Sequence, residues 1–185
     1  TNQGLTAVAI GGAAGSIDQG TGATAVGYQA GYTGQGVDAV AVGKTAGRNN
    51  QSENAVAIGD SAGGSAQALQ AVAIGQQAGE TSQSEKSVAI GPFAGMEQQG
   101  DRAVAIGHNT GKTNQGTKAV AIGTNAGTAN QHDNSIVINA TGIALDTTQV
   151  SEFIVKPVRA VAGALPAGFK QVAYNPTTGE FISYG

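Results

Sequence analysis

The sequence predicts an all-β protein: a parallel β-solenoid (β-roll) of about nine 16-residue coils, trimeric, with a C-terminal β cap. Three observations lead to this prediction. The pentad Ala-Val-Ala-Ile-Gly recurs at a constant spacing, glycine and glutamine columns keep the same spacing, and the period stops after residue 139. We therefore divide the chain into a β-roll of 16-residue repeats over 1–139 and a C-terminal cap or tip over 140–185.

The glycine that closes each pentad fixes the period. It returns every sixteen residues without an insertion, and Asn139 takes its ninth place. The column consists of Gly11, Gly27, Gly43, Gly59, Gly75, Gly91, Gly107 and Gly123. Sixteen residues are too few for a pair of helices, so each repeat is expected to form one coil of a solenoid. These glycines are expected in turns that need a positive φ or close stacking of coils.

A glutamine column runs through all nine repeats. Its members are Gln3, Gln19, Gln35, Gln51, Gln67, Gln83, Gln99, Gln115 and Gln131. Amides stacked one coil apart can form a ladder in which each side chain hydrogen bonds to its neighbour. We therefore assign a structural role to the glutamine column as well as to the glycines.

Alternation within the pentad predicts which side chains share a face. Val8 and Ile10 point to one side of their strand, which we expect to be the inside of the coil. The other side carries only small residues, and strands that are apolar on both faces are usually covered on both. We expect this second face to meet other copies of the chain about a symmetry axis, as a homotrimer. The predicted trimer interface consists of Ala9, Ala25, Ala41, Ala57, Ala73, Ala89, Ala105 and Ala121.

The pentads and their flanking residues resemble a known family. Residues 54–59 read Asn-Ala-Val-Ala-Ile-Gly, residues 86–91 read Lys-Ser-Val-Ala-Ile-Gly, and residues 134–139 read Asn-Ser-Ile-Val-Ile-Asn. These segments resemble the head repeat of the trimeric autotransporter adhesins, Asn-Ser-Val-Ala-Ile-Gly-x-x-Ser, which also occurs in phage and algal-virus fibre proteins. The resemblance implies a left-handed parallel β-roll that trimerises through its inner strand and binds host matrix or cells with its outer surface.

The C-terminal quarter differs in composition from the repeats. It contains most of the aromatic residues and prolines: Phe153, Phe169, Tyr174, Phe181, Tyr184, Pro157, Pro166 and Pro176. Segments 135–142, 153–159 and 172–181 are similar to fibre and tail-fibre proteins of phages and large algal viruses. Alternating runs around a Pro and Gly turn predict a hairpin over 172–184. A solenoid needs a cap on its last edge, and this cap could intertwine three chains or form the tip that meets a receptor.

Composition excludes several kinds of partner. Only 11% of residues are charged, the net charge is −3, and no basic stripe is present, which excludes nucleic acid. The sequence contains no apolar run of about 18 residues, so we do not expect it to insert into a membrane. The chain has no cysteine, and His108 and His132 have no partner at ligand spacing, so we expect neither a metal site nor a cofactor.

No residue is predicted to be catalytic, and we do not expect an enzyme. Residues 59–63 match the Gly-x-Ser-x-Gly nucleophile elbow, but both glycines belong to repeat columns. In the other coils the place of Ser61 holds Ala, Gln, Thr, Phe or Asn. Residues 107–113 are one residue short of a phosphate-binding loop, and no pair of acidic residues recurs at a fixed step.

The leading hypothesis is a structural and adhesive fibre protein, extracellular on a virion surface, that attaches to a host cell-surface glycan or protein. The receptor-binding residues are not identified, but the candidates are outward turn residues: Lys44, Arg48, Glu80, Glu97, Arg102, Lys112 and Lys118. The alternative is the head of a bacterial trimeric autotransporter adhesin on the bacterial outer surface. An ice-binding solenoid is a further alternative, with an interrupted ladder at Thr33, Thr81 and Thr113.

Overall fold

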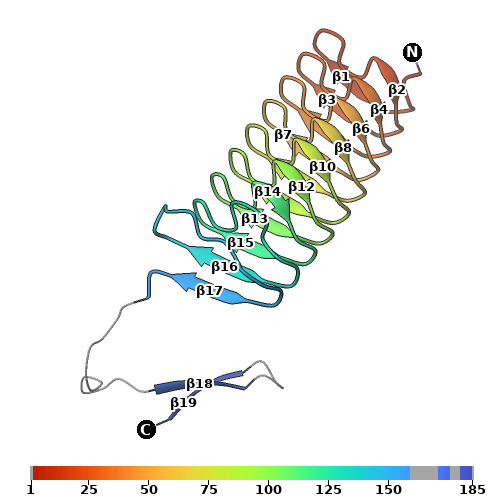
Figure 1. The fold of residues 1–185 in the computed structure, drawn as a ribbon. Helices are drawn as coiled ribbons and strands as arrows, with labels where there is room; N and C mark the ends of the chain where they lie inside the picture. Colours follow the sequence, from red (N-terminus) through yellow and green to blue (C-terminus); the bar gives the residue numbers. More distant parts are fainter. Residues whose placement is uncertain (1, 159–170, 176–179, 185) are drawn as a thin grey trace.

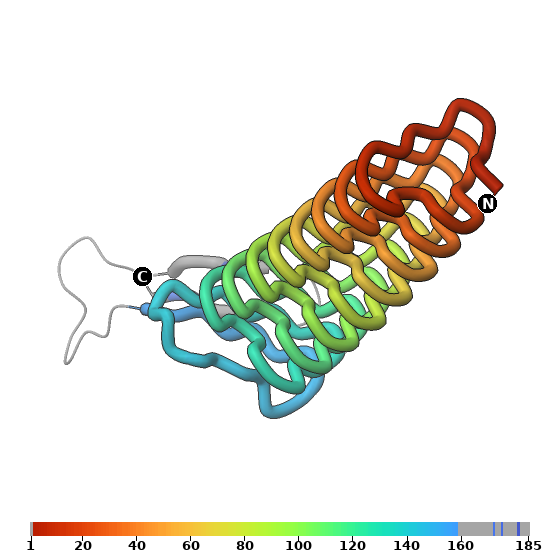
Figure 2. Tube along the Cα trace, turned by 90° about the horizontal axis from the view of Figure 1, so that it is seen from above, coloured from red at the N-terminus to blue at the C-terminus, as the bar shows by residue number. Residues whose placement is uncertain are grey.

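The fold is an all-β parallel solenoid of about nine turns, each of about sixteen residues, as the sequence predicts. The structure is a computed structural model that describes residues 2–158, 171–175 and 180–184. Within these ranges every regular element is a β-strand. The coils stack into a rod with the N-terminus at one end (Figure 1), and the view from above shows the regular winding of the chain (Figure 2).

Each repeat contributes a short strand to each of two sheets. The pentad strands form a ten-stranded parallel sheet, the pentad sheet: β1 (Val8–Ile10), β3 (Thr24–Val26), β5 (Val40–Val42), β7 (Val56–Ile58), β9 (Val72–Ile74), β11 (Val88–Ile90), β13 (Val104–Ile106), β15 (Val120–Ile122), β16 (Ile136–Asn139) and β17 (Phe153–Lys156). The strands that end in glutamine form a seven-stranded sheet, the glutamine sheet: β2 (Ile17–Gln19), β4 (Thr33–Gln35), β6 (Asn49–Gln51), β8 (Ser65–Gln67), β10 (Thr81–Gln83), β12 (Glu97–Gln99) and β14 (Thr113–Gln115). Equivalent residues lie side by side, so that Ala57 pairs with Ala41 and with Ala73.

Alanine fills the inside of the roll, and the predicted orientation of the pentad is wrong. Ala41 of β5 and Ala46 of the following turn are fully buried and belong to one continuous alanine core. The larger pentad residues point outward instead, and Ile58 and Ile106 are 39% and 38% exposed. Two three-residue strands joined by tight turns enclose a narrow interior, and overfilling such a close-packed space is destabilising. Methyl groups fill this interior from Ala25 to Ala121. Within the described roll, a larger apolar side chain enters it only in the last coils, where Val137 is fully buried with Leu145 and Ile154 packed against it.

The predicted trimer interface is corrected by the same finding. Seven of its eight alanines have no exposed surface in the isolated chain and therefore cannot contact another copy: Ala25, Ala41, Ala57, Ala73, Ala89, Ala105 and Ala121. Ala9 lies in the first coil and is exposed. The pentad sheet offers a partner its valine and isoleucine side chains, not its alanines.

The glycine column serves both of the purposes expected of it. From Gly11 to Gly123 the φ angles of these glycines lie between 101° and 133°, a region that L side chains rarely adopt. A Cβ atom built on Gly75 would lie 2.7 Å from the carbonyl carbon of Gly91 in the next coil. Any side chain at these positions would therefore be strained and would also push neighbouring coils apart.

The glutamine column forms the expected amide ladder. Gln19 to Gln131 are buried, and from Gln19 to Gln115 each Nε2 donates to the Oε1 of the glutamine one coil further on, at 3.0–3.2 Å. Gln3 is exposed and donates to the Ala7 carbonyl instead, so the ladder begins at Gln19. The Nε2 atoms of the ladder also donate to backbone carbonyls, as Gln67 does to Val56 at 2.8 Å and to Ala71 at 3.1 Å. The ladder thus connects the two sheets across the interior and connects each coil to the next.

The roll continues past the boundary predicted at residue 139. Strand β17 pairs in parallel with β16, and Phe153 lies beside Ile136, a step of seventeen residues. Thr147, sixteen residues after Gln131, is buried, and its Oγ1 accepts a hydrogen bond from the His132 backbone N–H at 2.8 Å. Backbone pairing therefore extends the sheet to Lys156 after the repeat sequence has ended.

The hairpin predicted near the C-terminus is confirmed. Strands β18 (Gln171–Asn175) and β19 (Glu180–Tyr184) pair antiparallel, with Tyr174 beside Phe181. The rings of Phe153 and Phe181 lie 5.9 Å apart. The predicted turn residue Pro176, together with Pro166 and Phe169, lies outside the described residues.

Candidate functional site

The outer surface of the pentad sheet is a continuous apolar stripe, which we call the aliphatic face. It consists of the outward-pointing first and third strand residues: Val8, Thr24, Val40, Val56, Val72, Val88, Val104, Val120, Ile136 and Phe153, and Ile10, Val26, Val42, Ile58, Ile74, Ile90, Ile106, Ile122, Ile138 and Val155. Threonine occurs once, and no member carries a charge. At about 4.8 Å per strand, the stripe is about 43 Å long.

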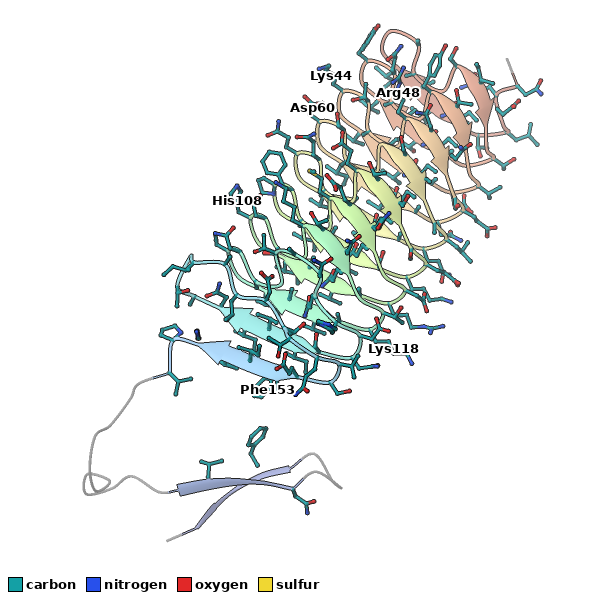
Figure 3. The ribbon with its side chains drawn as sticks, viewed as in Figure 1. Lys44, Arg48, Asp60, His108, Lys118 and Phe153 are labelled. Carbon is teal, nitrogen blue, oxygen red and sulfur yellow. The ribbon has the colours of Figure 1, made fainter. Side chains whose placement is uncertain are left out.

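Most charged side chains lie on the turns between the strands, and Asp18 and Glu97 lie on strands of the glutamine sheet. Figure 3 labels Lys44, Arg48, Asp60 and His108 along the roll. Ion pairs form between Lys44 and Asp60, whose Nζ and Oδ2 atoms are 3.8 Å apart, and within the neighbouring pairs Glu85–Lys86 and Asp101–Arg102. Charge is therefore distributed over the turns and the glutamine sheet, while the aliphatic face is left without any.

A hollow of about 330 Å³ opens on the wall formed by the glutamine sheet and the turns before it. We call it the Gly64 hollow; its lining is Lys44, Thr45, Arg48, Asn49, Ser61, Gly64, Ser65, Glu80 and Thr81. The residue before each glutamine-sheet strand has a side chain in the neighbouring coils, but this coil has Gly64. The corresponding residues are Ser16, Tyr32, Arg48, Glu80, Met96, Lys112 and Thr128. The missing side chain leaves a gap between Arg48 and Glu80.

Local contacts fix several of the side chains around the Gly64 hollow. The hydroxyl oxygens of Thr45 and Ser61 are 3.0 Å apart, within hydrogen-bond distance. Glu80 accepts a hydrogen bond of 2.8 Å from the amide of Gln77. The guanidinium of Arg48 lies over the ring of Tyr32, 6.0 Å from its centroid. The hollow therefore presents hydroxyl groups, a guanidinium and a carboxylate.

The predicted outward residues occupy different parts of the roll. Lys44, Arg48 and Glu80 line the Gly64 hollow, so the structure brings three of the seven together. Glu97 is exposed at the start of β12, and Arg102 and Lys118 are exposed on other turns. The Nζ atom of Lys112 lies 5.7 Å from the centroid of the Phe93 ring. The hollow was not predicted from the sequence, although Gly64 is the one glycine among the residues that directly precede the glutamine-sheet strands.

The histidines make separate local contacts. His108 packs edge-on against Phe93, with 5.9 Å between ring centroids, and the Nδ1 atom of His132 is 3.0 Å from the hydroxyl oxygen of Thr147. Among the residues that the structure describes, no group of three or more His, Cys, Asp or Glu side chains could hold a metal ion.

Two carboxyl groups away from the hollow have a lowered pKa. The pKa of Glu85 is lowered by its hydrogen bond to Lys86 and by the charge of that lysine. The pKa of Glu152 is lowered first by a hydrogen bond from the Thr148 backbone N–H and then by the hydroxyl of the same residue. Glu152 thereby fixes the turn that leads into β17.

The described part of the chain holds no helix with the length and apolarity needed to cross a membrane. Comparison with known proteins finds no significant match to a family model, a curated protein or a solved structure.

Proposed function

We propose that this chain is a structural and adhesive fibre segment that works as a homotrimer, as part of a virion or tail fibre that attaches to a host cell surface. The observation that supports this proposal best is the aliphatic face, twenty outward positions over ten strands without a charge. Contiguous apolar patches beyond a few hundred Å² are rare on monomers and mark interaction surfaces. A rod with one such stripe along its length is suited to side-by-side association.

Another copy of the same chain is the partner that fits this stripe best. It offers an apolar face of equal length with the same 16-residue step, so that parallel chains about a three-fold axis meet in register. Ile106 is 38% exposed, and full burial of such a side chain is favourable by about 1.5–3 kcal/mol. Covering its remaining surface contributes about 1 kcal/mol, and the contribution repeats along the stripe.

The turns support the adhesive part of the proposal. From coil to coil the alanine, glycine and glutamine columns stay constant, whereas the turn residues change in size and charge. Variable turns on a rigid scaffold are where binding residues usually lie. In this proposal the trimer is extracellular, and its turns or its C-terminal hairpin contact a host glycan or protein.

The trimer is tested by sedimentation equilibrium of the wild-type chain and of Ile90→Glu, which puts a charge on the aliphatic face. We expect the wild type to have three times the 18.1 kDa of one chain and Ile90→Glu to be a folded monomer. Thr113→Glu is the matched control, because Glu97 already occupies the equivalent position one coil earlier. A monomeric wild type would refute the trimer. A trimer that binds neither host cells nor their surface glycans would refute adhesion and leave a spacer.

A bacterial trimeric autotransporter head is the second candidate. Asn54 and Asn134, which precede the pentad as in that family's repeat, have φ angles of 56° and 57°. Asparagine adopts this left-handed region more readily than most residues, so an asparagine suits the backbone at the position before the pentad. Antibodies raised against the chain would label purified virions if it is a viral fibre, and the surface of intact bacteria if it is an autotransporter head.

A further inference from the structure

We infer that the Gly64 hollow binds one carboxylate-bearing sugar unit, of the sialic acid or hexuronic acid type. The inference rests on the proposed adhesive function and names the class of ligand and the residues that hold it. Its basis is the combination of a gap in the side-chain column, a lining rich in hydroxyl groups, and a guanidinium beside them.

The size of the hollow suits a single sugar. Its volume of about 330 Å³ lies at the lower end of the range for small-molecule sites, about 300–1,000 Å³. Arg48 and Glu80 belong to the coils on either side of Gly64, so their backbones are two coil steps apart, about 9.6 Å. The ligand would occupy the volume that a side chain fills in neighbouring coils.

The lining matches a polyhydroxylated ligand better than a simple anion. The hydroxyl protons of Thr45 and Ser61 are used within the protein, which leaves these two oxygens as acceptors. The hydroxyl groups of Ser65 and Thr81 and the amide of Asn49 provide both donors and acceptors. Sugar hydroxyls likewise both donate and accept. A phosphate or sulfate ion would leave the acceptors unused and would be repelled by the carboxylate of Glu80.

Arg48 is the anchor for the carboxylate of the sugar. Among the described residues its guanidinium forms no ion pair, whereas Lys44 is paired with Asp60. The cation–π contact with Tyr32, at 6.0 Å, places the guanidinium over that ring and leaves its N–H groups available for a two-point contact with a carboxylate. Glu80 on the other side of Gly64 accepts hydrogen bonds from sugar hydroxyls and repels a second carboxylate, which fixes the orientation of the ligand.

Saturation-transfer NMR titrations with the methyl glycosides of N-acetylneuraminic acid, glucuronic acid and galactose test this site. We expect at least one acidic glycoside to bind, with the galactoside at least tenfold weaker. Arg48→Gln is expected to lower the acidic glycoside's affinity at least tenfold by removing a charge-assisted contact. Gly64→Met fills the hollow as Met96 fills its own coil, and is expected to abolish binding. Lys86→Gln, which removes a positive charge from another turn that does not line the hollow, is the control and should bind like the wild type.

The outcomes separate this inference from the proposed function. Binding of only one acidic glycoside would support the site and identify the sugar type. Binding that is unchanged in both Arg48→Gln and Gly64→Met, or equal for galactose, would overturn it. Attachment to host cells without binding of either acidic glycoside would overturn the site and leave the adhesive function standing. Glycoside binding in the hollow without attachment to cells would support the site and refute adhesion.

Discussion

Replacing Gln67 by leucine tests whether the amide ladder stabilises the roll. Gln67 has no exposed surface; its Nε2 donates to Val56 O, Ala71 O and Gln83 Oε1, and its Oε1 accepts from Gln51 at 3.1 Å. Leucine has a similar size and no polar atom, so Gln67→Leu removes all four hydrogen bonds with little change in packing.

The size of the destabilisation depends on which hydrogen bonds the former partners of Gln67 keep after the substitution. Gln51 still donates to two backbone carbonyls, and Ala71 O still accepts from the Val56 N–H. Gln83 Oε1 loses its donor, and a buried acceptor without a partner costs about 1–3 kcal/mol. With about 0.5–1.5 kcal/mol for each of the three remaining bonds, Gln67→Leu should lower the free energy of unfolding by about 2.5–7.5 kcal/mol.

Urea denaturation followed by circular dichroism, at one protein concentration, measures this change. The matched control is Gln76→Leu on the exposed turn of the next coil, which should stay within about 0.5 kcal/mol of the wild type. Gln19→Leu should cost less than Gln67→Leu, because Gln19 Oε1 has no hydrogen-bond donor to lose. Equal stability of Gln67→Leu and Gln76→Leu would refute the view that the ladder stabilises the roll.

Two further predictions concern glycine and a carboxyl group. Gly75→Ala should lower the urea midpoint markedly, because its Cβ would lie 2.7 Å from the Gly91 backbone and its φ is 124°. Gly64→Ala should lower the midpoint less, because its Cβ would lie 3.2 Å from the Ser61 carbonyl oxygen and its φ is not positive. A carboxyl NMR titration should give Glu152 a pKa below its ordinary value, and Thr148→Ala should raise it part of the way back. Since folding lowers this pKa, the stabilisation is present above the unfolded pKa of about 4.3 and is lost as the pH falls through the folded value.

The architecture could be predicted because it depends on the period alone. Sixteen-residue columns of glycine and glutamine leave few folds other than a stacked coil, and the hairpin over 172–184 follows from local turn chemistry. The inside of the roll could not be assigned in the same way. Both faces of the pentad are apolar, so alternation separates the two faces without saying which is buried.

One signal in the sequence did distinguish the two faces. Over the eight pentads the column of Ala9 is alanine throughout, whereas the column of Val8 also admits threonine at Thr24. The two strands that follow change both columns, to Val137 and Ile154 in the first and to Ile136 and Phe153 in the second. A close-packed interior tolerates less change in volume than a surface does, so the invariant column is the buried one. The tenth strand β17 was not predictable from the period, because it follows a seventeen-residue step with threonine in place of glutamine.

The two proposed surfaces depend on each other physically. A hollow of about 330 Å³ offers one sugar only a few polar contacts, which implies weak binding at each site. Trimerisation through the aliphatic face would repeat the hollow three times around the rod, on strands and turns that the interface does not use. Linked sites exceed the affinity of one site by about 10²–10⁴-fold when they engage together. Firm attachment by weak sites of this kind therefore requires the assembly that the aliphatic face makes possible.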